Sequence, residues 1–416
     1  MNAAVALRPA PALAPPGARL RGPRPLRVVL VSDSYLPRLG GIELHVRDLA
    51  TRLSAAGHDV HVLTATGDLP GAPAAPFAVH RLQPAGVAAP VDPVLWTGAD
   101  RSAVPGLLAG ADVVHAHSSV LSPLAWTAVR QAHRLGVPAV VTVHSMLPRG
   151  GALPLAAALS RRRAGAVRWT AVSGAVAAPL RAATGCPVDV LPNGVDPLPW
   201  REAVRCSSPG GGGTFTVVTA GRFTARKRPL AMVRALRSVR ARVPAHVRLR
   251  AVMVGEGPQR EAAAAAVVRH GLAGWVELPG SVSRGELARL FAAADAYAAP
   301  AVWESFGLAA LEARCAGLPV VGMAGSGLAE FVTHGVEGAL AADDRDLARV
   351  LARWAVDRDE VRRIRRHNTA TVPAVTWERV LPAAVAQYEA ARSAPLGAVP
   401  HAAVLRLPST QAPLPG

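Results

Sequence analysis

The stretch "VDVLPNGVDPLPWREAVRCSSPGGGGTFTVVTAG", residues 188–221, shows how this chain is divided. Its first part, 188–196, ends a series of short β-branched runs, and its last part, 215–221, begins a second series. The residues between them, 197–214, are rich in proline, serine and glycine, which is typical of a linker. The sequence therefore predicts two domains of similar size that are joined near residue 205.

On both sides of this linker, apolar runs typical of buried strands alternate with amphipathic stretches typical of helices. The first run is "RVVLVS" (27–32), which a glycine-rich turn and a helix from about Ile42 to Ala56 follow. Such alternation predicts an α/β fold with two doubly wound, Rossmann-like domains, each a parallel sheet between helices. Open parallel sheets bind ligands beyond the C-terminal ends of their strands, so we expect a cleft between the domains.

The remaining strand candidates are "HDVHVLT", "DVVHAH", "PAVVTVH" and "VRWTAVS" before the linker, and "FTVVTAG", "VRLRAVMVG", "GWVELPG", "ADAYAAP" and "LPVVG" after it. The predicted domains are 27–196 and 215–375. Residues 1–26 are rich in alanine, proline and arginine, and their apolar run "AAVAL" is too short for a signal peptide, so we predict a disordered leader. The alanine- and proline-rich residues 393–416 predict a disordered tail.

The composition excludes several classes of protein. The chain of 416 residues has a net charge of +18 but only 4% aromatic residues, and no nucleic-acid recognition motif accompanies the charge. Anionic small ligands or an anionic membrane surface fit this charge better, and solvated arginines set by codon bias fit it equally well. No apolar run is long enough to span a membrane.

The three cysteines point to the reducing cytosol. Cys186, Cys206 and Cys315 are scattered without CxxC spacing, which predicts neither a disulfide framework nor a zinc site. We therefore expect a cytoplasmic protein, either free or peripheral at the inner face of the plasma membrane.

The loop "GRFTARKRP" (221–229) contains the only lysine of the chain, Lys227. Arg222 stands five positions earlier, so two cations can approach one anion from different sides of the loop. Lysine makes a point contact to a phosphate, whereas arginine offers a planar fork. The alternative is a solvated loop with ordinary surface cations.

The segment "PAVWESFGLAALEARCAGLPVVG" (300–322) carries two glutamates. We predict a helix from about Ser305, whose free amides at the N-terminus can accept a diphosphate. Glu304 precedes this helix and faces the cleft, while Glu312 lies two turns into it and can accept two hydroxyl donors, such as those of a ribose. The glycines of "AVMVGEGP" (251–258) permit either close approach of a ligand or a plain turn.

Taken together, these segments resemble the retaining GT-B glycosyltransferases of family 4 (group 1), which use nucleotide sugars. The resemblance runs from about residue 27 to residue 390. It also includes "LGGIELHVRDLATRLSAAGHDVHVLT", "DVVHAHS", "VTVHS", "AVS", "LPNGVD" and "LPGSVSRGELARLFAAADAYAAP". The segment at 376–392 is similar to the C-terminal helix that crosses back to the first domain in this fold.

The resemblance implies a role for each matching residue. Arg222 and Lys227 match the pair that neutralises the donor diphosphate, Glu304 matches the glutamate near the transferred sugar, and Glu312 matches the glutamate on the ribose. His144 matches a histidine near the reacting sugar, so His144, Arg222, Lys227 and Glu304 are the candidate catalytic residues. The further donor-binding candidates are Gly40, Gly41, Gly255, Val282, Ser305, Phe306, Gly307 and Leu308. The chain departs from the family at Ala329, where relatives often carry proline before a glutamate, here Glu330, which the resemblance implies as a contact of the donor sugar.

No metal or other cofactor is expected. The Asp-x-Asp patterns in "DDRD" (343–346) and "DRD" (357–359) lie beyond the last strand signals, where solvated helix ends explain them. Arg222, Lys227 and a helix N-terminus are sufficient to stabilise leaving-group charge. The basic stretch "SRRRAG" (160–165) is either a solvated face or a contact to lipid headgroups.

The implied activity is transfer of a hexose from a UDP- or GDP-sugar, with retention of configuration at the anomeric carbon. The expected acceptor is lipid-linked or a glycan at the membrane surface, and the first alternative is a soluble small-molecule acceptor. A catalytically silent nucleotide-sugar-binding protein is the alternative from another class. Nonhydrolysing epimerases share the architecture, but these motifs fit transfer better.

Overall fold

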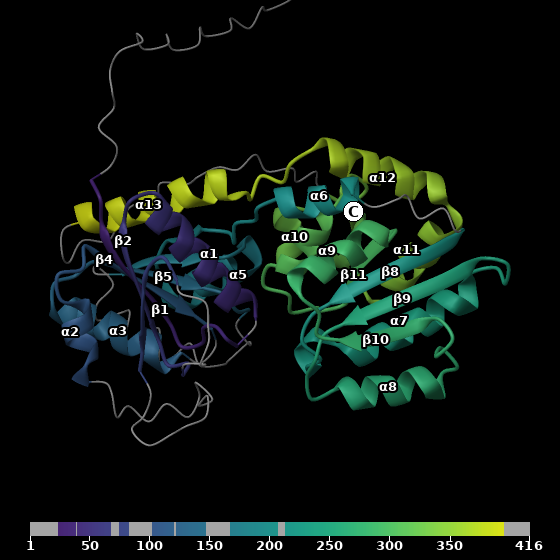
Figure 1. The fold of residues 1–416 in the computed structure, drawn as a ribbon, viewed down its shortest axis with the longest axis horizontal. Coiled ribbons are helices and arrows are strands. Elements are labelled where there is room, and N and C mark those ends of the chain that lie inside the picture. Colours follow the sequence, from purple (N-terminus) through teal and green to yellow (C-terminus); the bar gives the residue numbers. More distant parts are fainter. Residues whose placement is uncertain are drawn as a thin grey trace, which may run out of the picture.

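The computed structural model describes residues 24–38, 40–67, 75–82, 102–119, 122–146, 167–206 and 213–394. It shows two Rossmann-like lobes that lie side by side, each built around a parallel sheet (Figure 1). Most of the predicted leader and nearly all of the predicted tail therefore lie outside the described residues. Leu26, which we assigned to the leader, is fully buried in the first domain, so the folded chain begins before residue 27.

The first sheet has the strand order β3-β2-β1-β4-β5-β6-β7, and every pairing in it is parallel. The strands are β1 (Arg27–Ser32), β2 (Asp59–Thr64), β3 (Ala78–Arg81), β4 (Val113–Ser118), β5 (Ala139–Val143), β6 (Val167–Ala171) and β7 (Val188–Val190). The helices that accompany it are α1 (Gly41–Ala55), α2 (Val104–Leu108), α3 (Pro123–Arg134) and α5 (Gly174–Thr184).

The second sheet has the order β10-β9-β8-β11-β12-β13 and is also parallel. Its strands are β8 (Thr214–Ala220), β9 (Arg248–Val254), β10 (Val276–Gly280), β11 (Ala296–Ala299), β12 (Val320–Met323) and β13 (Gly338–Ala341). The helices around it are α7 (Pro229–Arg242), α8 (Arg260–Arg269), α9 (Arg284–Ala293), α10 (Leu308–Cys315), α11 (Asp344–Val356) and α12 (Arg358–Ala370). Two 3-10 turns, η3 (Ala225–Lys227) and η4 (Gly327–Glu330), lie in loops that follow strands.

The predicted fold class is confirmed, and each strand candidate forms a strand. The strands that we did not predict, β3, β7 and β13, are only 4, 3 and 4 residues long and lie at sheet edges. Such short runs give little periodic signal. The predicted helix start at Ser305 is wrong, because Gly307 has a φ of +90° and α10 begins only at Leu308.

Part of the predicted linker is an ordered helix. Within 197–214, α6 (Leu198–Arg205) packs against α9, and its Trp200 is fully buried beside Phe291. The two indole and phenyl rings have centroids 5.7 Å apart. Burial of this large aromatic side chain contributes to holding the short helix on the second domain.

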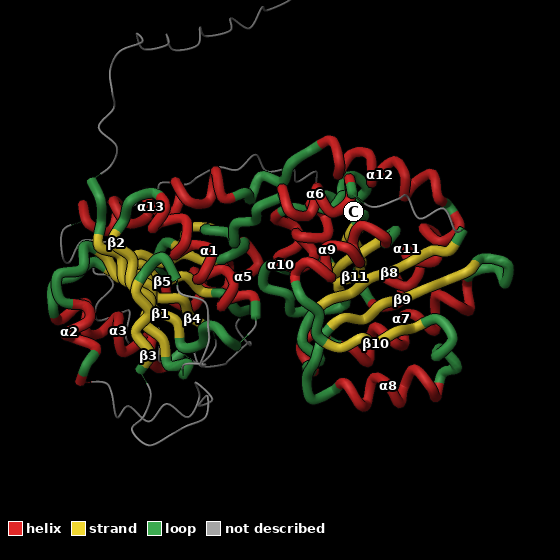
Figure 2. The backbone as a smooth tube through the Cα atoms, in the orientation of Figure 1, coloured by secondary structure: helices red, strands yellow, loops and turns green. Residues whose placement is uncertain are grey.

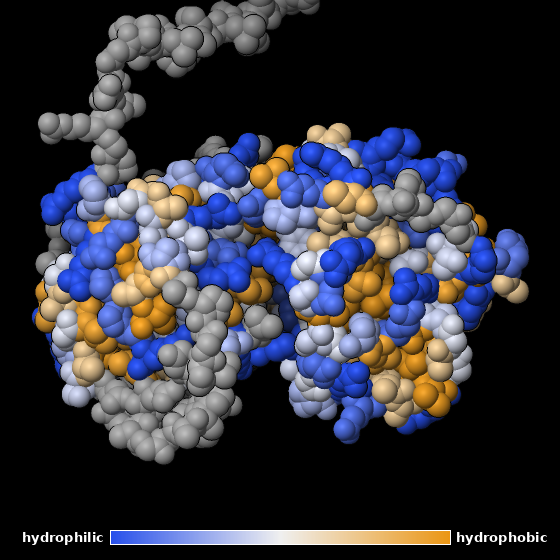
Figure 3. Space-filling model, in the orientation of Figure 1, coloured by the Kyte–Doolittle hydropathy of each residue, from blue (hydrophilic) through white to orange (hydrophobic). Residues whose placement is uncertain are grey.

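The C-terminal helix α13 (Trp377–Ser393) crosses back to the first domain, as predicted (Figures 1 and 2). Trp377 and Tyr388 are buried in the same core as the side chains of β1, β2 and α1. A parallel bridge from Val195 to Thr376 joins the two crossing segments of chain. On the face seen in Figure 3, hydrophilic residues cover the boundary between the two lobes.

Candidate active site

The loop after β8 holds its cations through a tight turn. Lys227 ends η3, and Arg228 follows in the left-handed region with a φ of +57°, so the chain can turn into α7. A non-glycine residue in this region carries a conformational cost. The guanidinium of Arg228 offsets it with two hydrogen bonds to the Asp344 carboxylate, at 2.7 and 2.8 Å, and one to the Pro300 carbonyl. These contacts fix the loop against β11 and α11.

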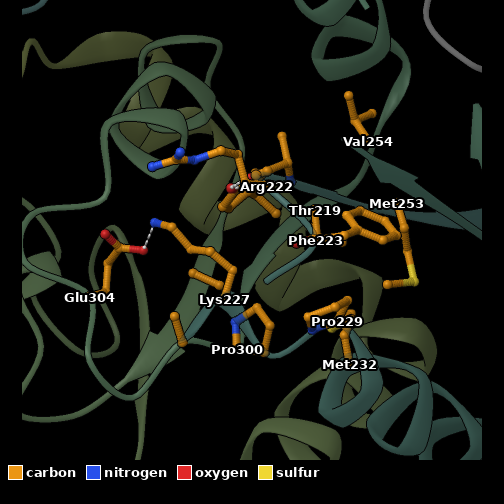
Figure 4. Close-up of a pocket in the computed structure, with 15 residues that line it drawn as sticks. Thr219, Arg222, Phe223, Lys227, Pro229, Met232, Met253, Val254, Pro300 and Glu304 are labelled. Atoms are coloured by element: carbon orange, nitrogen blue, oxygen red, sulfur yellow. Dashed lines mark hydrogen bonds and ion pairs between the residues drawn. The ribbon is translucent and has the colours of Figure 1, made fainter. Parts of the chain in front are cut away.

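Lys227 and Glu304 form an ion pair, with 2.6 Å between Nζ and Oε2. Arg222 and Lys227 extend toward Glu304 from the same loop and line one cavity with it (Figure 4). The structure therefore brings together three of the four predicted catalytic residues. A diphosphate placed here would lie within reach of two cations beside a mostly buried carboxylate.

Arg226 is a further cation of this loop, and the sequence interpretation missed it. Its Nη2 donates to Ser305 Oγ at 3.0 Å, and its Nε donates to the Trp303 carbonyl at 3.3 Å. Desolvation lowers the pKa of Arg226, the nearby Glu304 raises it, and the nearby Arg222 lowers it further. The cluster "ARKR" (225–228) was visible in the quoted loop, but the family resemblance drew attention only to Arg222 and Lys227.

The segment 304–308, called the motif loop below, sets the start of α10. Phe306 is buried and packs against Phe331, with ring centroids 5.5 Å apart. Gly307 is the N-cap, and a Cβ at this position would lie 2.9 Å from Leu328 Cδ1 in a backbone conformation that glycine favours. Leu308 is the first helical residue, so the free N–H groups of this helix begin beside Glu304.

Glu312 lies on α10 with its side chain only 7% exposed. Burial raises its pKa to about 7, and the guanidinium of Arg284 opposes that shift. Arg284 Nη2 lies 2.8 Å from Glu312 Oε1, and its Nη1 lies 3.6 Å from the Asp48 carboxylate of α1. The predicted ribose acceptor is therefore already paired with a cation, which bridges to the first domain. Val282, two residues before Arg284 in the chain, is partly buried. It packs against the core cluster that contains the buried apolar side chains of α10.

The predicted glycines lie at loop ends near the cleft. Gly255 has a φ of +139°, and a Cβ there would lie 1.9 Å from the Gly221 carbonyl oxygen, so only glycine lets the two loops approach. Gly40 is the N-cap of α1 and Gly41 is its first residue. Both therefore lie at the N-terminus of the helix that also carries Asp48.

His144 follows β5 and belongs to a buried cluster that the sequence did not reveal. Its Nε2 lies 2.9 Å from Nδ1 of His117, and the ring of His45 is 5.4 Å from its own. Desolvation lowers the pKa of all three, that of His45 to about 4, so the rings are neutral at neutral pH. One nitrogen from each ring lies within 4.8 Å of the others, so this group is the set of described residues able to hold a metal ion.

Hydrogen bonds join the motif loop to the first domain. Ser305 Oγ accepts from the Met146 N–H at 3.2 Å, and the Ser305 carbonyl accepts from Ser173 Oγ at 2.6 Å. Glu330 Oε1 accepts from the Gly174 N–H at 2.6 Å, and burial raises the pKa of this carboxyl. His144 lies two residues before Met146, whose N–H bonds to Ser305. This hydrogen bond links the chain segment that carries His144 to the loop that carries Glu304.

The two Asp-x-Asp patterns are helix ends, as predicted. Asp343 caps α11 by accepting from the Asp346 N–H, and Asp357 caps α12 by accepting from the N–H groups of Asp359 and Glu360. The stretch 160–165 lies outside the described residues. Among the helices that the structure describes, none has the length and apolar character needed to cross a membrane.

Two family models match this chain, and each covers one of its two domains. The model described as "Glycosyl transferases group 1" matches residues 202–371, and the one described as "Glycosyltransferase Family 4" matches residues 39–197. A D-inositol 3-phosphate glycosyltransferase of Pseudarthrobacter chlorophenolicus is 30% identical over 407 residues, covering 85% of this chain and 90% of the relative. A glycogen synthase of Mycobacterium tuberculosis is 28% identical over 412 residues, covering 88% and 95%.

A third relative acts on a lipid. The GDP-mannose-dependent phosphatidylinositol dimannoside mannosyltransferase of Mycobacterium tuberculosis is 29% identical over 386 residues, covering 85% of this chain and 93% of that protein. Among solved structures, Anabaena HepE in complex with UDP and glucose has a TM-score of 0.70 at 20% identity, covering 88% of this chain and all of that one. Sucrose-phosphate synthase of Thermosynechococcus elongatus has a TM-score of 0.70 at 22% identity, covering 88% and 98%. These two structures share the GT-B fold with this chain.

Proposed function

This chain belongs to the group 1, or family 4, glycosyltransferases, and on that premise we propose that it moves a hexose from a UDP- or GDP-sugar to an acceptor with retention of configuration. The observation that carries the proposal is the convergence of Arg222, Lys227 and Glu304 at the C-terminal ends of β8 and β11. Cations, a carboxylate and the N-terminus of α10 meet there, which is the chemistry that a nucleotide diphosphate sugar needs.

The cations act on the leaving group. When the donor binds, its diphosphate takes the place of Glu304 as the partner of Lys227, and Arg222 contacts the same phosphates. These positive charges stabilise the negative charge that develops as the bond between the anomeric carbon and the phosphate oxygen breaks. Glu304, released from Lys227, then accepts hydroxyl groups of the sugar.

Retention follows from attack on the face that the diphosphate leaves. The acceptor oxygen bonds to the anomeric carbon, and the acceptor proton passes to the departing phosphate oxygen, so no protein side chain has to be a strong base. Neutral His144 of the first domain then hydrogen-bonds to the sugar without competing for the diphosphate. The bonds from Ser305 to the first domain hold the motif loop in place and help to exclude water.

We expect the reaction to need no metal, because Arg222, Lys227 and the α10 amides supply the positive charge. The test is transfer activity measured in excess EDTA and again with added Mg²⁺. Equal rates support this expectation, and a loss of activity in EDTA that Mg²⁺ restores contradicts it.

For the acceptor, we propose a lipid-linked or glycan substrate at the cytoplasmic face of the membrane. The net charge of +18 supports it, because each cation near an anionic surface contributes about 1 kcal/mol of attraction. A relative named for a phosphatidylinositol mannoside agrees with a lipid acceptor. The alternative is a soluble acceptor, since another relative is named for D-inositol 3-phosphate. Flotation with vesicles of phosphatidylcholine, with and without phosphatidylglycerol, separates the two: protein that stays out of both lipid fractions at low salt contradicts the membrane site.

The decisive experiment is calorimetric binding of UDP, GDP and their glucose and mannose conjugates to the wild-type protein and to Lys227→Ala. One nucleotide should bind in the micromolar range, and the variant should lose that binding. Folded wild-type protein that binds neither nucleotide contradicts the proposed function. Binding without transfer or donor hydrolysis under any acceptor condition would favour the silent binding protein.

A further inference from the structure

We propose that His117 is a positioning residue for the transfer: its Nδ1–H bonds to Nε2 of His144 and keeps the hydrogen of His144 on Nδ1, where that ring offers an N–H to the sugar. The inference rests on the proposed function and adds a residue to it, because the family resemblance assigned no role to His117. It is carried by one hydrogen bond between two buried rings, by a ring nitrogen without a partner, and by the packing around the pair.

Two neighbouring strands fix His117 and His144 relative to each other. His117 lies on β4, and His144 follows directly after β5, which pairs with β4 in parallel. The backbone N–H of His144 donates to the Ser118 carbonyl at 2.8 Å, so the pairing of the two strands continues through this residue. Nδ1 of His117 then lies 2.9 Å from Nε2 of His144, which is hydrogen-bond distance.

Both rings are neutral, so one of them donates and the other accepts. Desolvation lowers the pKa of His117 and of His144 well below the ordinary value, and nearby histidine rings add to this effect. In a neutral imidazole, one nitrogen carries a hydrogen and the other a lone pair. If His117 donates from Nδ1, His144 carries its own hydrogen on Nδ1. If His144 donates instead, the hydrogen of His117 is on Nε2.

The second ring nitrogen of His117 decides between these two arrangements. Nε2 of His117 is buried and has no hydrogen-bond partner among the described residues. A hydrogen on this atom would be a buried donor without an acceptor, which folded proteins avoid more strictly than a buried acceptor without a donor. The hydrogen of His117 is therefore on Nδ1, and His144 accepts it at Nε2 and carries its own hydrogen on Nδ1.

The surrounding side chains hold His117 in this orientation. Its residue is 1% exposed, and its ring centroid lies 4.1 Å from that of His115. His115 is itself held by Tyr388 of α13 and Thr142 of β5, through hydrogen bonds of 2.8 and 2.7 Å. A ring packed in this way has little room to rotate, so its Nδ1–H stays directed at His144.

His144 is the more accessible member of the pair. It is 6% exposed, and Met146, two residues later, bonds to Ser305 of the motif loop. In the proposed reaction, the Nδ1–H of His144 bonds to an oxygen of the sugar. The bond from His117 strengthens that contact, because hydrogen bonds in a chain polarise one another. His117 thus acts through His144 and touches neither substrate.

NMR of the full chain labelled with nitrogen-15 histidine tests this hydrogen bond without any ligand. Protonated and bare imidazole nitrogens have well-separated shifts, and the signals are assigned by their loss in His117→Asn and His144→Asn. We expect His144 to carry its hydrogen on Nδ1 in the wild type. His117→Asn places an amide N–H near the position of Nδ1 and should keep this tautomer. His117→Leu has the same branching at Cγ but no N–H, so both tautomers of His144 should appear.

Steady-state kinetics show whether the pair acts in the reaction. The donor is UDP-glucose or GDP-mannose, whichever the wild type transfers or hydrolyses. His117→Leu should lower kcat about tenfold, because one hydrogen bond in the transition state is weakened, and it should leave KM for the donor within about twofold. His117→Asn should keep kcat within about threefold of the wild type. A hydrogen on Nε2 of His144 in the wild type, or equal losses of kcat in the two variants, overturns the inference.

A double-mutant cycle separates positioning from an independent role. In the His144→Ala background the partner ring is gone, so adding His117→Leu should lower kcat no further. His115→Leu removes the neighbouring buried histidine and its bond to Tyr388. This control should lower the midpoint of urea denaturation but leave the tautomer of His144 unchanged. A further fall of kcat in the double variant overturns the inference. Wild-type protein that has the expected tautomers but binds neither UDP nor GDP overturns the proposed function instead.

Discussion

The two domains differ in how they hold their titratable side chains. The second domain presents the cations Arg222, Arg226 and Lys227 on one accessible loop, close to the Glu304 carboxylate. The first domain instead contains a buried and neutral cluster, His45, His117 and His144. In the proposed reaction, the cationic loop binds the departing diphosphate, and the uncharged cluster does not attract it. Neither domain alone supplies both properties.

The largest effect is expected when a positive charge is removed from the cationic loop of the second domain. Lys227→Ala should lower kcat/KM for the donor about 100- to 1,000-fold, because the charge that stabilises the leaving group is lost while Glu304 remains unpaired. The measurement is steady-state transfer or donor hydrolysis with the nucleotide sugar that binds.

Arg237→Ala is the matched control, since it removes a solvent-exposed cation from α7 in the same domain. It should leave kcat/KM within about twofold of the wild type. Equal losses in both variants would mean that overall basic charge, and not the position of Lys227, supports the reaction.

A second way to sharpen the contrast is to disturb how the charged loop is held. Gly255→Ala adds a Cβ 1.9 Å from the Gly221 carbonyl oxygen in a backbone conformation that alanine rarely adopts. We expect the free energy of unfolding to fall by about 2–3 kcal/mol, because strain and overpacking add together. Urea denaturation measures this loss.

Gly274→Ala serves as its control, because a Cβ there meets no atom within 4 Å. It should change the midpoint only slightly. If Gly255→Ala were equally harmless, the close approach of the two loops would have no part in holding the cations.

The same contrast explains how far the sequence predicted the site. Arg222, Lys227, Glu304 and Glu312 lie in two short segments, so their spacing along the chain approximates their spacing in the fold. His45, His117 and His144 come from α1, the end of β4 and the loop after β5, and only parallel pairing of these strands brings them together. Local spacing carries no information about such a meeting point.

Contacts between the domains were also beyond prediction. The bonds from Ser173 to Ser305 and from Gly174 to Glu330 join residues more than 130 positions apart. The fold itself was predictable because strand and helix periodicities are local. The helix in the predicted linker was missed because its stability comes from burial of Trp200 against another helix, which a local pattern does not reveal.

Acidification tests whether the buried histidines of the first domain are neutral in the folded protein. Burial depresses the pKa of His45 to about 4 and that of His115, hydrogen-bonded to Tyr388, to about 3, against an ordinary value of 6.5. The unfolded chain therefore binds more protons than the folded one below pH 6.5, so stability is fully present above this pH and falls as the pH drops toward 4. Each such histidine contributes a slope of at most about 1.4 kcal/mol per pH unit.

The measurement is urea denaturation at pH 7.5, 6.0 and 5.0 for the wild type and His45→Gln, with the exposed His246→Gln as control. The free energy of unfolding should depend less steeply on pH in the His45 variant, by the contribution of one histidine, although this variant is less stable at every pH. A pH dependence that is the same in all three proteins would show that the buried rings already titrate in the folded state.

The smallest expected effect concerns Glu312, which is buried like the histidines but paired with a cation like Glu304. Burial raises the pKa of this carboxyl to about 7, so it gains charge between pH 6 and pH 8 and then accepts ribose hydroxyls more strongly. Nucleotide affinity should therefore rise about three- to tenfold over that interval in the wild type, and this carboxylate-dependent rise should be absent in Glu312→Gln. The phosphate of the nucleotide titrates with both proteins, so the difference between the two calorimetric profiles reports Glu312 alone.

Glu277→Gln, an exposed carboxylate paired with Arg250, should follow the wild-type profile. Parallel profiles for the wild type and Glu312→Gln would mean that the ion pair with Arg284 keeps Glu312 charged throughout this range. In that case both glutamates of the second domain, Glu304 and Glu312, would be held in ion pairs with cations, whereas the histidine cluster of the first domain is neutral.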